Sequence, residues 1–191
     1  EFGGKGLEAG VVIIAGVPPD LRQALLDARR PHLLRIQGPN CLGLMVPQIG
    51  LNASFCHRMP RTGDLAFVSQ SGALITAVVD WASRRDIGFS HVVSVGDMAD
   101  VDFGDLLDYL AGDGKTRAIL LYMEHLTHAP KFMSAARRAA RAKPVVVLKA
   151  GRTALGARAS ASHTGALAGD DKVYDDVLRQ SGVIRARSLN E

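Results

Sequence analysis

The chain has 191 residues, of which 47% are hydrophobic and 22% are charged, and its formal net charge is +4. Such a balance is typical of a globular protein that holds one large domain, or a small domain with part of a second. The basic residues are scattered and no aromatic residues alternate with them, which argues against a nucleic-acid interface. No apolar run reaches the roughly 20 residues of a membrane span and no signal peptide opens the chain, so we expect a cytoplasmic protein that does not contact a membrane.

Strands and helices alternate along the sequence. Short apolar runs that lack polar alternation predict strands buried on both faces at residues 11–15, 65–69, 92–95, 119–123 and 145–148, with a further short strand at 33–36. Helical patterns are predicted at residues 20–30, 73–85, 103–110, 131–141 and 171–180. This alternation indicates βαβ units around a parallel sheet.

A change in composition divides the chain. Residues 47–63 hold two prolines and two glycines and show no periodicity, so we place a linker at residues 51–63. Residues 1–50, which end in an apolar run at 42–46, contain too few elements for a complete doubly wound domain. Residues 64–191 provide enough βαβ units for a doubly wound parallel sheet of about five strands.

Two short motifs resemble those of common enzyme classes but fail their requirements. The tripeptide GKT at Gly114 ends like a P-loop, yet Tyr109 stands where that loop needs a glycine. The segment VSQSG resembles the nucleophile elbow of a hydrolase, yet Ser69 stands where the elbow needs a glycine. His125 and His128 have no further ligands at suitable spacing, so we expect no metal site. The sequence therefore supports neither a P-loop nucleotidase, a serine hydrolase nor a metalloprotein.

The segment Ser69-Gln70-Ser71-Gly72 lies where a predicted buried strand ends and a helix begins at once. Backbone N–H groups and the positive end of the helix dipole at such a step favour an anion. Serine hydroxyls can add hydrogen bonds, and Gly72 lets an anion approach the backbone. The alternative is that serine simply caps the helix, which the local sequence favours.

Glu124 follows the last residue of the predicted strand at 119–123. In open α/β sheets, ligands bind outside the carboxyl ends of the strands, so this carboxylate is a candidate for the site. The alternative is a solvated acid in a loop.

His163 lies in the segment ASASHTGALAGDD, which is poor in large side chains. A lone histidine is usually structural, but a structural ring normally has bulky neighbours on which to pack. A glycine- and alanine-rich segment is suited to movement or to close contact with an anion. Neutral imidazole is a nucleophile near pH 7, and a carboxylate such as that of Glu124 could hold one ring N–H and leave the other nitrogen free to attack.

Three motifs together resemble those of a known family: GPNCLG at residues 38–43, SQSGAL at 69–74 and SHTGALAG at 162–169. At these motifs, and over nearly the whole chain from about residue 5, the sequence is similar to NDP-forming acyl-CoA synthetases, which are related to the α chain of succinyl-CoA synthetase. The resemblance implies a flavodoxin-like, succinyl-CoA ligase-like domain, preceded by the C-terminal part of a Rossmann-like CoA-binding domain at residues 1–50.

The resemblance also implies roles for individual residues. The family's phosphorylated histidine falls on His163, and its orienting glutamate falls on Glu124. The phosphate-binding residues of the family fall on Ser69, Gln70, Ser71 and Gly72, and on Thr164 and Gly165 beside the histidine. The segment near the thioester end of CoA falls on Asn40, Cys41 and Gly43.

In such enzymes acyl-CoA and phosphate give acyl phosphate and CoA, and the phosphoryl group passes to histidine and then to ADP. The implied ligands are CoA or acyl-CoA and phosphate, together with ATP or ADP and Mg²⁺ on an ATP-grasp domain or subunit that this sequence lacks. The first half of the CoA-binding domain, with its glycine-rich loop, is missing too. We therefore expect a component that is inactive alone and that works in a homo- or hetero-oligomer.

A second function is also consistent with the resemblance. Bacterial protein lysine acetyltransferases carry a synthetase-like region fused to an N-acetyltransferase domain, and LLDYLAGDGKTRAILLYMEHL is especially similar to theirs. There the region could sense CoA or acyl-CoA, or serve in assembly. The histidine motif is often eroded in those regulatory members, whereas His163, Thr164 and Gly165 are intact here, which favours phosphoryl chemistry.

Overall fold

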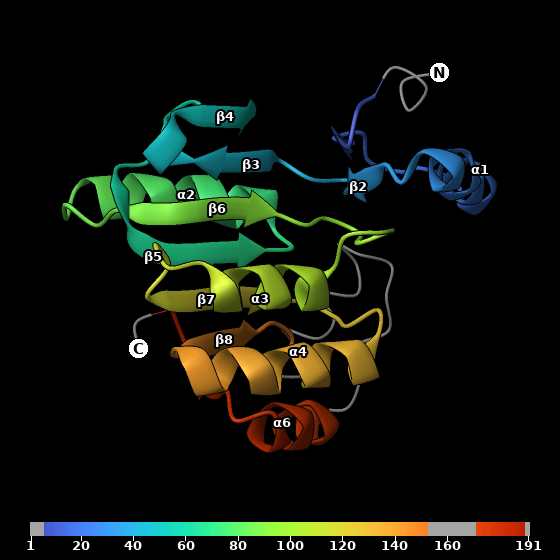
Figure 1. Cartoon of the computed structure of the whole chain (residues 1–191). Coiled ribbons are helices and arrows are strands. Elements are labelled where there is room, and N and C mark those ends of the chain that lie inside the picture. Colours follow the sequence, from blue (N-terminus) through green and yellow to red (C-terminus); the bar gives the residue numbers. More distant parts are fainter. Residues whose placement is uncertain (1–5, 153–170, 190–191) are drawn as a thin grey trace.

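The computed structural model describes residues 6–152 and 171–189 (Figure 1). Five strands of its larger sheet are parallel: β5 (Thr62–Ser69), β6 (Phe89–Ser94), β7 (Ala118–Met123), β8 (Val145–Lys149) and β9 (Ile184–Ala186). They lie in the order β6-β5-β7-β8-β9. Counted along the chain, this is the 2-1-3-4-5 order of flavodoxin-like folds, so the predicted fold class is confirmed.

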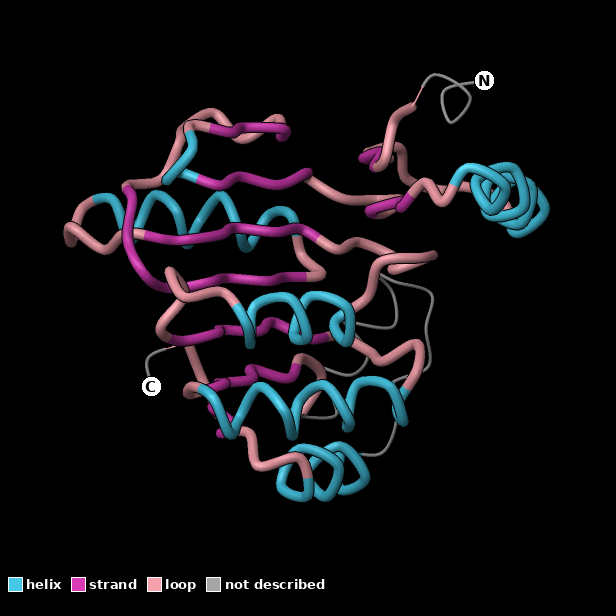
Figure 2. The backbone as a smooth tube through the Cα atoms, viewed as in Figure 1, coloured by secondary structure: helices cyan, strands magenta, loops and turns pink. Residues whose placement is uncertain are grey.

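Among the described residues, helices cover both faces of this sheet. In Figure 2, α3 (Phe103–Gly112) and α4 (Ala129–Ala142) lie in front of the strands and α2 (Gly72–Ser83) lies behind them. The buried side chains form two clusters, and α6 (Asp171–Gln180) contributes Leu178 to the cluster that contains α3 and α4. The cluster under α2 includes Ile75 and Phe89. Each such side chain stabilises the fold by about 1.5–3 kcal/mol when it is fully buried.

Two antiparallel strands extend the sheet beyond β6. Strand β3 (Gly43–Val46) pairs with β6 on one side and with β4 (Leu51–Ser54) on the other. The turn η3 (Pro47–Ile49) connects β3 to β4. Residues 43–54 therefore belong to the larger sheet, which differs from the expected linker at residues 51–63. Strand β4 lies at the sheet edge and most of its side chains are exposed. A solvated edge strand needs no apolar pattern, so its sequence gives little sign of a strand.

The first part of the chain forms a small separate sheet. Strands β1 (Ala9–Val11) and β2 (Arg35–Gln37) are parallel, and α1 (Pro19–Arg29) and the turn η2 (Arg30–His32) lie between them in sequence. The first strand thus occupies residues 9–11 rather than the predicted 11–15. Asp100 joins this part to the larger sheet through ion pairs with Arg29 (2.9 Å) and Arg35 (3.1 Å). Within residues 6–152 and 171–189, no helix is both long and apolar enough to cross a membrane.

Candidate functional site

The candidate site lies where β5 and β7 end side by side. The chain leaves β5 toward β6 on one side, and β7 lies on the other, so this is the point at which the strand order reverses. Ligands bind at such switch points in open α/β sheets. Ser69 pairs with Tyr122, two residues before Glu124. The two segments that sequence analysis selected for phosphate and for the orienting carboxylate are therefore neighbours.

The two serines shape the start of α2. Ser71 is the N-cap, and its Oγ accepts a hydrogen bond from the N–H of Leu74 at 3.2 Å. Ser69 is fully buried, and its Oγ accepts from Ser71 N at 3.0 Å and donates to Ser71 O at 2.9 Å. The Ser71 hydroxyl therefore caps α2, as the alternative expected, whereas the Ser69 hydroxyl holds the backbone of Ser71. Helix α2 begins at Gly72, so its first backbone N–H groups lie at this edge of the sheet. The positive end of the helix dipole at this point favours an anion.

Gln70 binds the end of β7 with both atoms of its amide. Its Oε1 accepts from the backbone N–H of Glu124 at 2.6 Å and of His125 at 3.0 Å. Its Nε2 lies 3.2 Å from Nδ1 of His125, and its backbone N–H donates to Tyr122 O at 3.2 Å. Gln70 is buried, at 7% exposure. It therefore fixes the position of the backbone that carries Glu124 relative to the start of α2.

The His125 ring lies among charged groups from three other parts of the chain. Burial is the main reason why the pKa of His125 is lowered, and Lys149 and Arg22 lower it further, while Asp97 opposes them. Asp97 also accepts from Asn40 Nδ2 at 3.0 Å and from Arg22 at 3.2 Å. The loop after β6 thereby connects the GPNCLG turn and α1 to this edge of the sheet.

A buried lysine completes the edge. Lys149, the last residue of β8, is 6% exposed, and its Nζ donates to Ala150 O at 2.5 Å and lies 4.4 Å from the centre of the Tyr174 ring. The Tyr174 hydroxyl accepts from Leu126 N at 3.3 Å. Burial lowers the pKa of Lys149 and Arg185 lowers it further, while the carboxylates of Asp171 and, to a smaller extent, Glu124 act in the opposite direction. A cation close to Glu124 adds positive potential where phosphate is predicted to bind.

The residues predicted to border the acyl group have well-defined structural contacts. Cys41 is 3% exposed, its Sγ donates to Val12 O at 3.3 Å, and burial raises the pKa of its thiol. Gly43 has φ +111°, and a Cβ there would lie 2.2 Å from Ala53 O, so β3 and β4 can pair closely only with glycine. Asn40 is exposed and binds Asp97. Acyl binding by these three residues remains a prediction.

The structure therefore brings Ser69–Gly72 and Glu124 together and connects Asn40 to them through Asp97. His163, Thr164 and Gly165 lie outside the described residues. Sequence analysis assigned no role to Asp97 or Lys149, although each is a charged residue at or just after the carboxyl end of a predicted strand. No group of three His, Cys, Asp or Glu side chains that could hold a metal occurs within residues 6–152 and 171–189.

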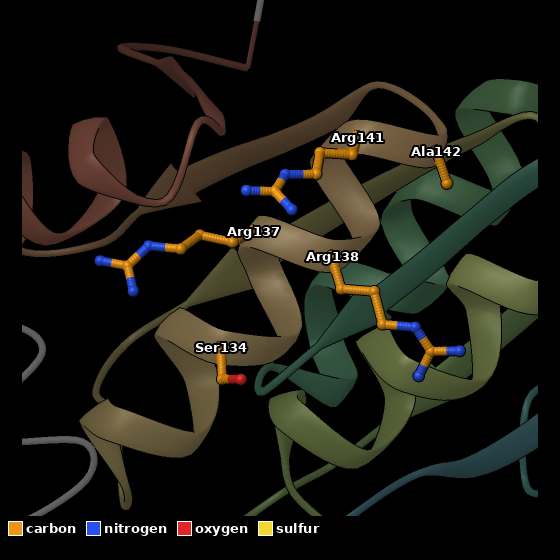
Figure 3. Close-up of a pocket in the computed structure, with 5 residues that line it drawn as sticks. All are labelled: Ser134, Arg137, Arg138, Arg141 and Ala142. Carbon is orange, nitrogen blue, oxygen red and sulfur yellow. The ribbon is translucent and has the colours of Figure 1, made fainter.

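A hollow on the outer face of α4 lies apart from this edge. Figure 3 shows that it is lined by Ser134, Arg137, Arg138, Arg141 and Ala142. Arg138 pairs with Asp108 at 3.3 Å, and Arg137 Nε donates to Gln180 O at 3.2 Å. These contacts are typical of a solvated helix face.

Comparison with known proteins gives consistent matches. The family model of the succinyl-CoA ligase-like flavodoxin domain matches residues 62–191. Acetate–CoA ligase [ADP-forming] I of Archaeoglobus fulgidus is 46% identical over 100% of this chain, which covers 29% of that relative. The alpha subunit of acetate–CoA ligase [ADP-forming] I of Pyrococcus furiosus is 43% identical over the whole chain, which covers 43% of it. The chain thus spans less than half the length of these relatives.

A solved structure agrees with these matches. The dinucleotide-forming acetyl-coenzyme A synthetase 1 of Ca. Korarchaeum cryptofilum, in complex with phosphate and ADP, has a TM-score of 0.92 and 38% sequence identity. The match covers 98% of this chain and 42% of that one. By sequence and by structure, the chain belongs to the family of succinyl-CoA ligase-like flavodoxin domains.

Proposed function

We propose that this chain is the phosphohistidine-bearing region of an NDP-forming acyl-CoA synthetase of the acetate–CoA ligase type. The observation that supports this most directly is the double hydrogen bond from the end of β7 to Gln70, which holds Glu124 beside the start of α2. The relatives that match the whole chain are named as ADP-forming CoA ligases. They therefore favour this function over the sensing or assembly role in an acetyltransferase.

The proposed reaction has three displacements. A phosphate oxygen attacks the acyl carbonyl carbon, the C–S bond breaks, and CoA leaves as a thiolate that takes up a proton. A ring nitrogen of His163 then attacks phosphorus and the acyl carboxylate leaves. Finally an oxygen of the ADP β-phosphate attacks phosphorus, the P–N bond breaks, and ATP forms. The first displacement transfers the acyl group to phosphate, and the second and third transfer a phosphoryl group. For the phosphoryl transfers, the protein's contribution is positioning and stabilisation of charge.

The described residues have distinct tasks in this scheme. The start of α2 at Ser69–Gly72 meets the negative charge of phosphate with N–H groups and the helix dipole. Glu124 accepts the N–H of the His163 ring and leaves the other ring nitrogen free to attack. Thr164 and Gly165 are expected to add contacts to the phosphoryl group. Lys149 contributes positive potential at the same edge.

The remaining parts of the proposal concern CoA and the nucleotide. Residues before Gly43, with β1, α1 and β2, form the last part of a Rossmann-like CoA-binding domain, and Asn40, Cys41 and Gly43 lie near the thioester. Residues 64–191 form the succinyl-CoA ligase-like domain. Nucleotide with Mg²⁺ binds to an ATP-grasp domain or subunit, in a homo- or hetero-oligomer that works in the cytoplasm.

Incubation of the complete protein with ATP labelled on the γ-phosphate tests this function. We expect an acid-labile, base-stable label that disappears in His163→Ala and persists in His57→Ala, which changes an exposed histidine paired with Asp80. Absence of label in both the unmodified protein and the variants would instead support the sensing role. Glu124→Gln should lower the amount of label while the melting temperature changes little. A melting temperature that falls in step with the label would show that Glu124 is structural.

A further inference from the structure

The contacts of Gln70 determine the protonation of a neighbouring ring. Its Oε1 receives two backbone N–H groups, those of Glu124 at 2.6 Å and His125 at 3.0 Å, so this atom must be the amide oxygen. The amide nitrogen therefore faces Nδ1 of His125 at 3.2 Å. An amide N–H₂ only donates, so Nδ1 must accept and carries no proton. The His125 ring is then neutral, with its proton on Nε2.

We propose that Gln70 and His125 form a pH-sensitive clamp that positions Glu124, closed when the His125 ring is neutral and opened by its protonation. The clamp is a property of the described residues, and only its effect on phosphoryl transfer rests on the proposed function. In this proposal Gln70 and His125 are positioning residues, since they act through the backbone that carries Glu124.

Protonation of Nδ1 sets two donors against each other. The new Nδ1–H faces the amide N–H₂ of Gln70, and that contact becomes repulsive. If the Gln70 amide rotates to present its oxygen to the ring, its N–H₂ group then faces the N–H groups of Glu124 and His125, and both of those hydrogen bonds are lost. If the ring moves away instead, the amide nitrogen of Gln70 loses its partner, and the ring no longer fixes the amide in the orientation that accepts the two backbone N–H groups. In either case the backbone of Glu124 is held less firmly.

The surroundings of the ring set the pH range. Burial and the cations Lys149, on β8, and Arg22, on α1, lower the pKa of His125. Asp97, in the loop after β6, has the opposite effect, and on its own segment the ring follows Glu124. The clamp is therefore closed at neutral pH and opens on acidification below the ordinary range of histidine.

Two variants in the complete protein test the clamp by different chemistry. Gln70→Glu keeps an oxygen toward the two backbone N–H groups and offers a second oxygen that can accept Nδ1–H, so the clamp stays closed when the ring is charged. His125→Asn places an amide oxygen near the position of Nδ1 and cannot titrate. The acid limb is the pH range in which the rate of histidine labelling falls as the solution becomes more acidic. We expect both variants to displace this limb to lower pH. His57→Asn, which changes an exposed histidine paired with Asp80, should leave that limb in place.

A merely structural role would scale the rate equally at every pH, and unchanged acid limbs in both variants would overturn the proposal. Nitrogen-15 spectra of labelled histidine give a second readout that needs no activity. We expect His125 to carry its proton on Nε2 at pH 7.5 and to titrate at higher pH in Gln70→Glu. A proton on Nδ1 in the unmodified protein would refute the clamp. Persistence of the label in His163→Ala would refute the proposed function while leaving this spectroscopic result valid.

Discussion

Gly96 allows the GPNCLG turn to approach the loop that carries Asp97. It has φ +56°, and a Cβ at this position would lie 2.1 Å from Pro39 O and 2.5 Å from Asn40 O. Both obstacles are backbone atoms, so a side-chain rotation cannot relieve the clash. Gly96→Ala must therefore push the turn away from the loop, and with it Asn40 away from Asp97.

The cost of this substitution can be worked out from the contacts. A residue with a Cβ in the left-handed conformation costs about 1–2 kcal/mol. Moving the turn also breaks the hydrogen bonds from Asp97 N to Pro39 O (2.9 Å) and from Ala99 N to Gly38 O (3.0 Å), each worth about 1 kcal/mol. We expect a loss of about 3–4 kcal/mol in the free energy of unfolding. For a chain of this size that lowers the melting temperature by about 6–16 °C.

This effect is measured by urea unfolding, in which the free energy of unfolding of Gly96→Ala is compared with that of Gly112→Ala. Gly112 lies in α3 without a positive φ, and apart from its chain neighbours and the backbone of its own helix nothing lies within 4 Å of the position its Cβ would take. Alanine should therefore stabilise the helix there by about 0.5–1 kcal/mol. If Gly96→Ala lost less than about 1 kcal/mol, or if the two variants behaved alike, the close approach of the turn would be wrong.

Two further predictions concern buried titratable groups. Burial lowers the pKa of Lys149, so its charge is less favourable in the folded protein than in the unfolded chain. Lys149→Met should therefore keep or raise the urea midpoint at pH 7 and should slow the labelling of His163. A lower midpoint would contradict this prediction. Burial also lowers the pKa of His91, and Asp113 opposes this shift only in part. In acid, His91 therefore takes up a proton when the protein unfolds. The free energy of unfolding should decrease as pH falls below about 6.5, the unfolded value, and His91→Asn should reduce that slope between pH 7 and 5; an unchanged slope would exclude His91 as its source.

Much of the larger sheet could be predicted from the sequence because its strands are buried on both faces. The apolar runs at 65–69 and 119–123 coincide with β5 and β7, and all the predicted helices are present. Strands β4 and β9, which were missed, are short and solvated, as Ile184 of β9 illustrates with 58% exposure. The apolar residues Ile13 and Ile14 led the first strand to be placed too late, yet they are 56% and 64% exposed and lie outside β1. A pattern of side chains cannot indicate a strand that the core does not cover.

The site shows the same division. The neighbourhood of Ser69–Gly72 and Glu124 was predictable, because carboxyl ends of parallel strands lie at one edge of a sheet. The contacts of Gln70 with Glu124 and His125 were not, because they join segments more than 50 residues apart and depend on β5 lying next to β7. The link from Asp97 to Arg22 likewise depends on how the small sheet docks.

The described residues on either side of the segment that contains His163 meet at this edge of the sheet. Lys149 precedes His163 in the sequence and Tyr174 follows it, and the ammonium of the first lies 4.4 Å from the ring centre of the second. The Tyr174 hydroxyl also accepts the N–H of Leu126, two residues after Glu124. Lys149 and Tyr174 therefore lie together, next to the backbone that follows the proposed orienting carboxylate. Burial is unfavourable for the charge of Lys149, and ionisable groups with shifted pKa values are frequent at functional sites, so Lys149 is a candidate for the proposed site.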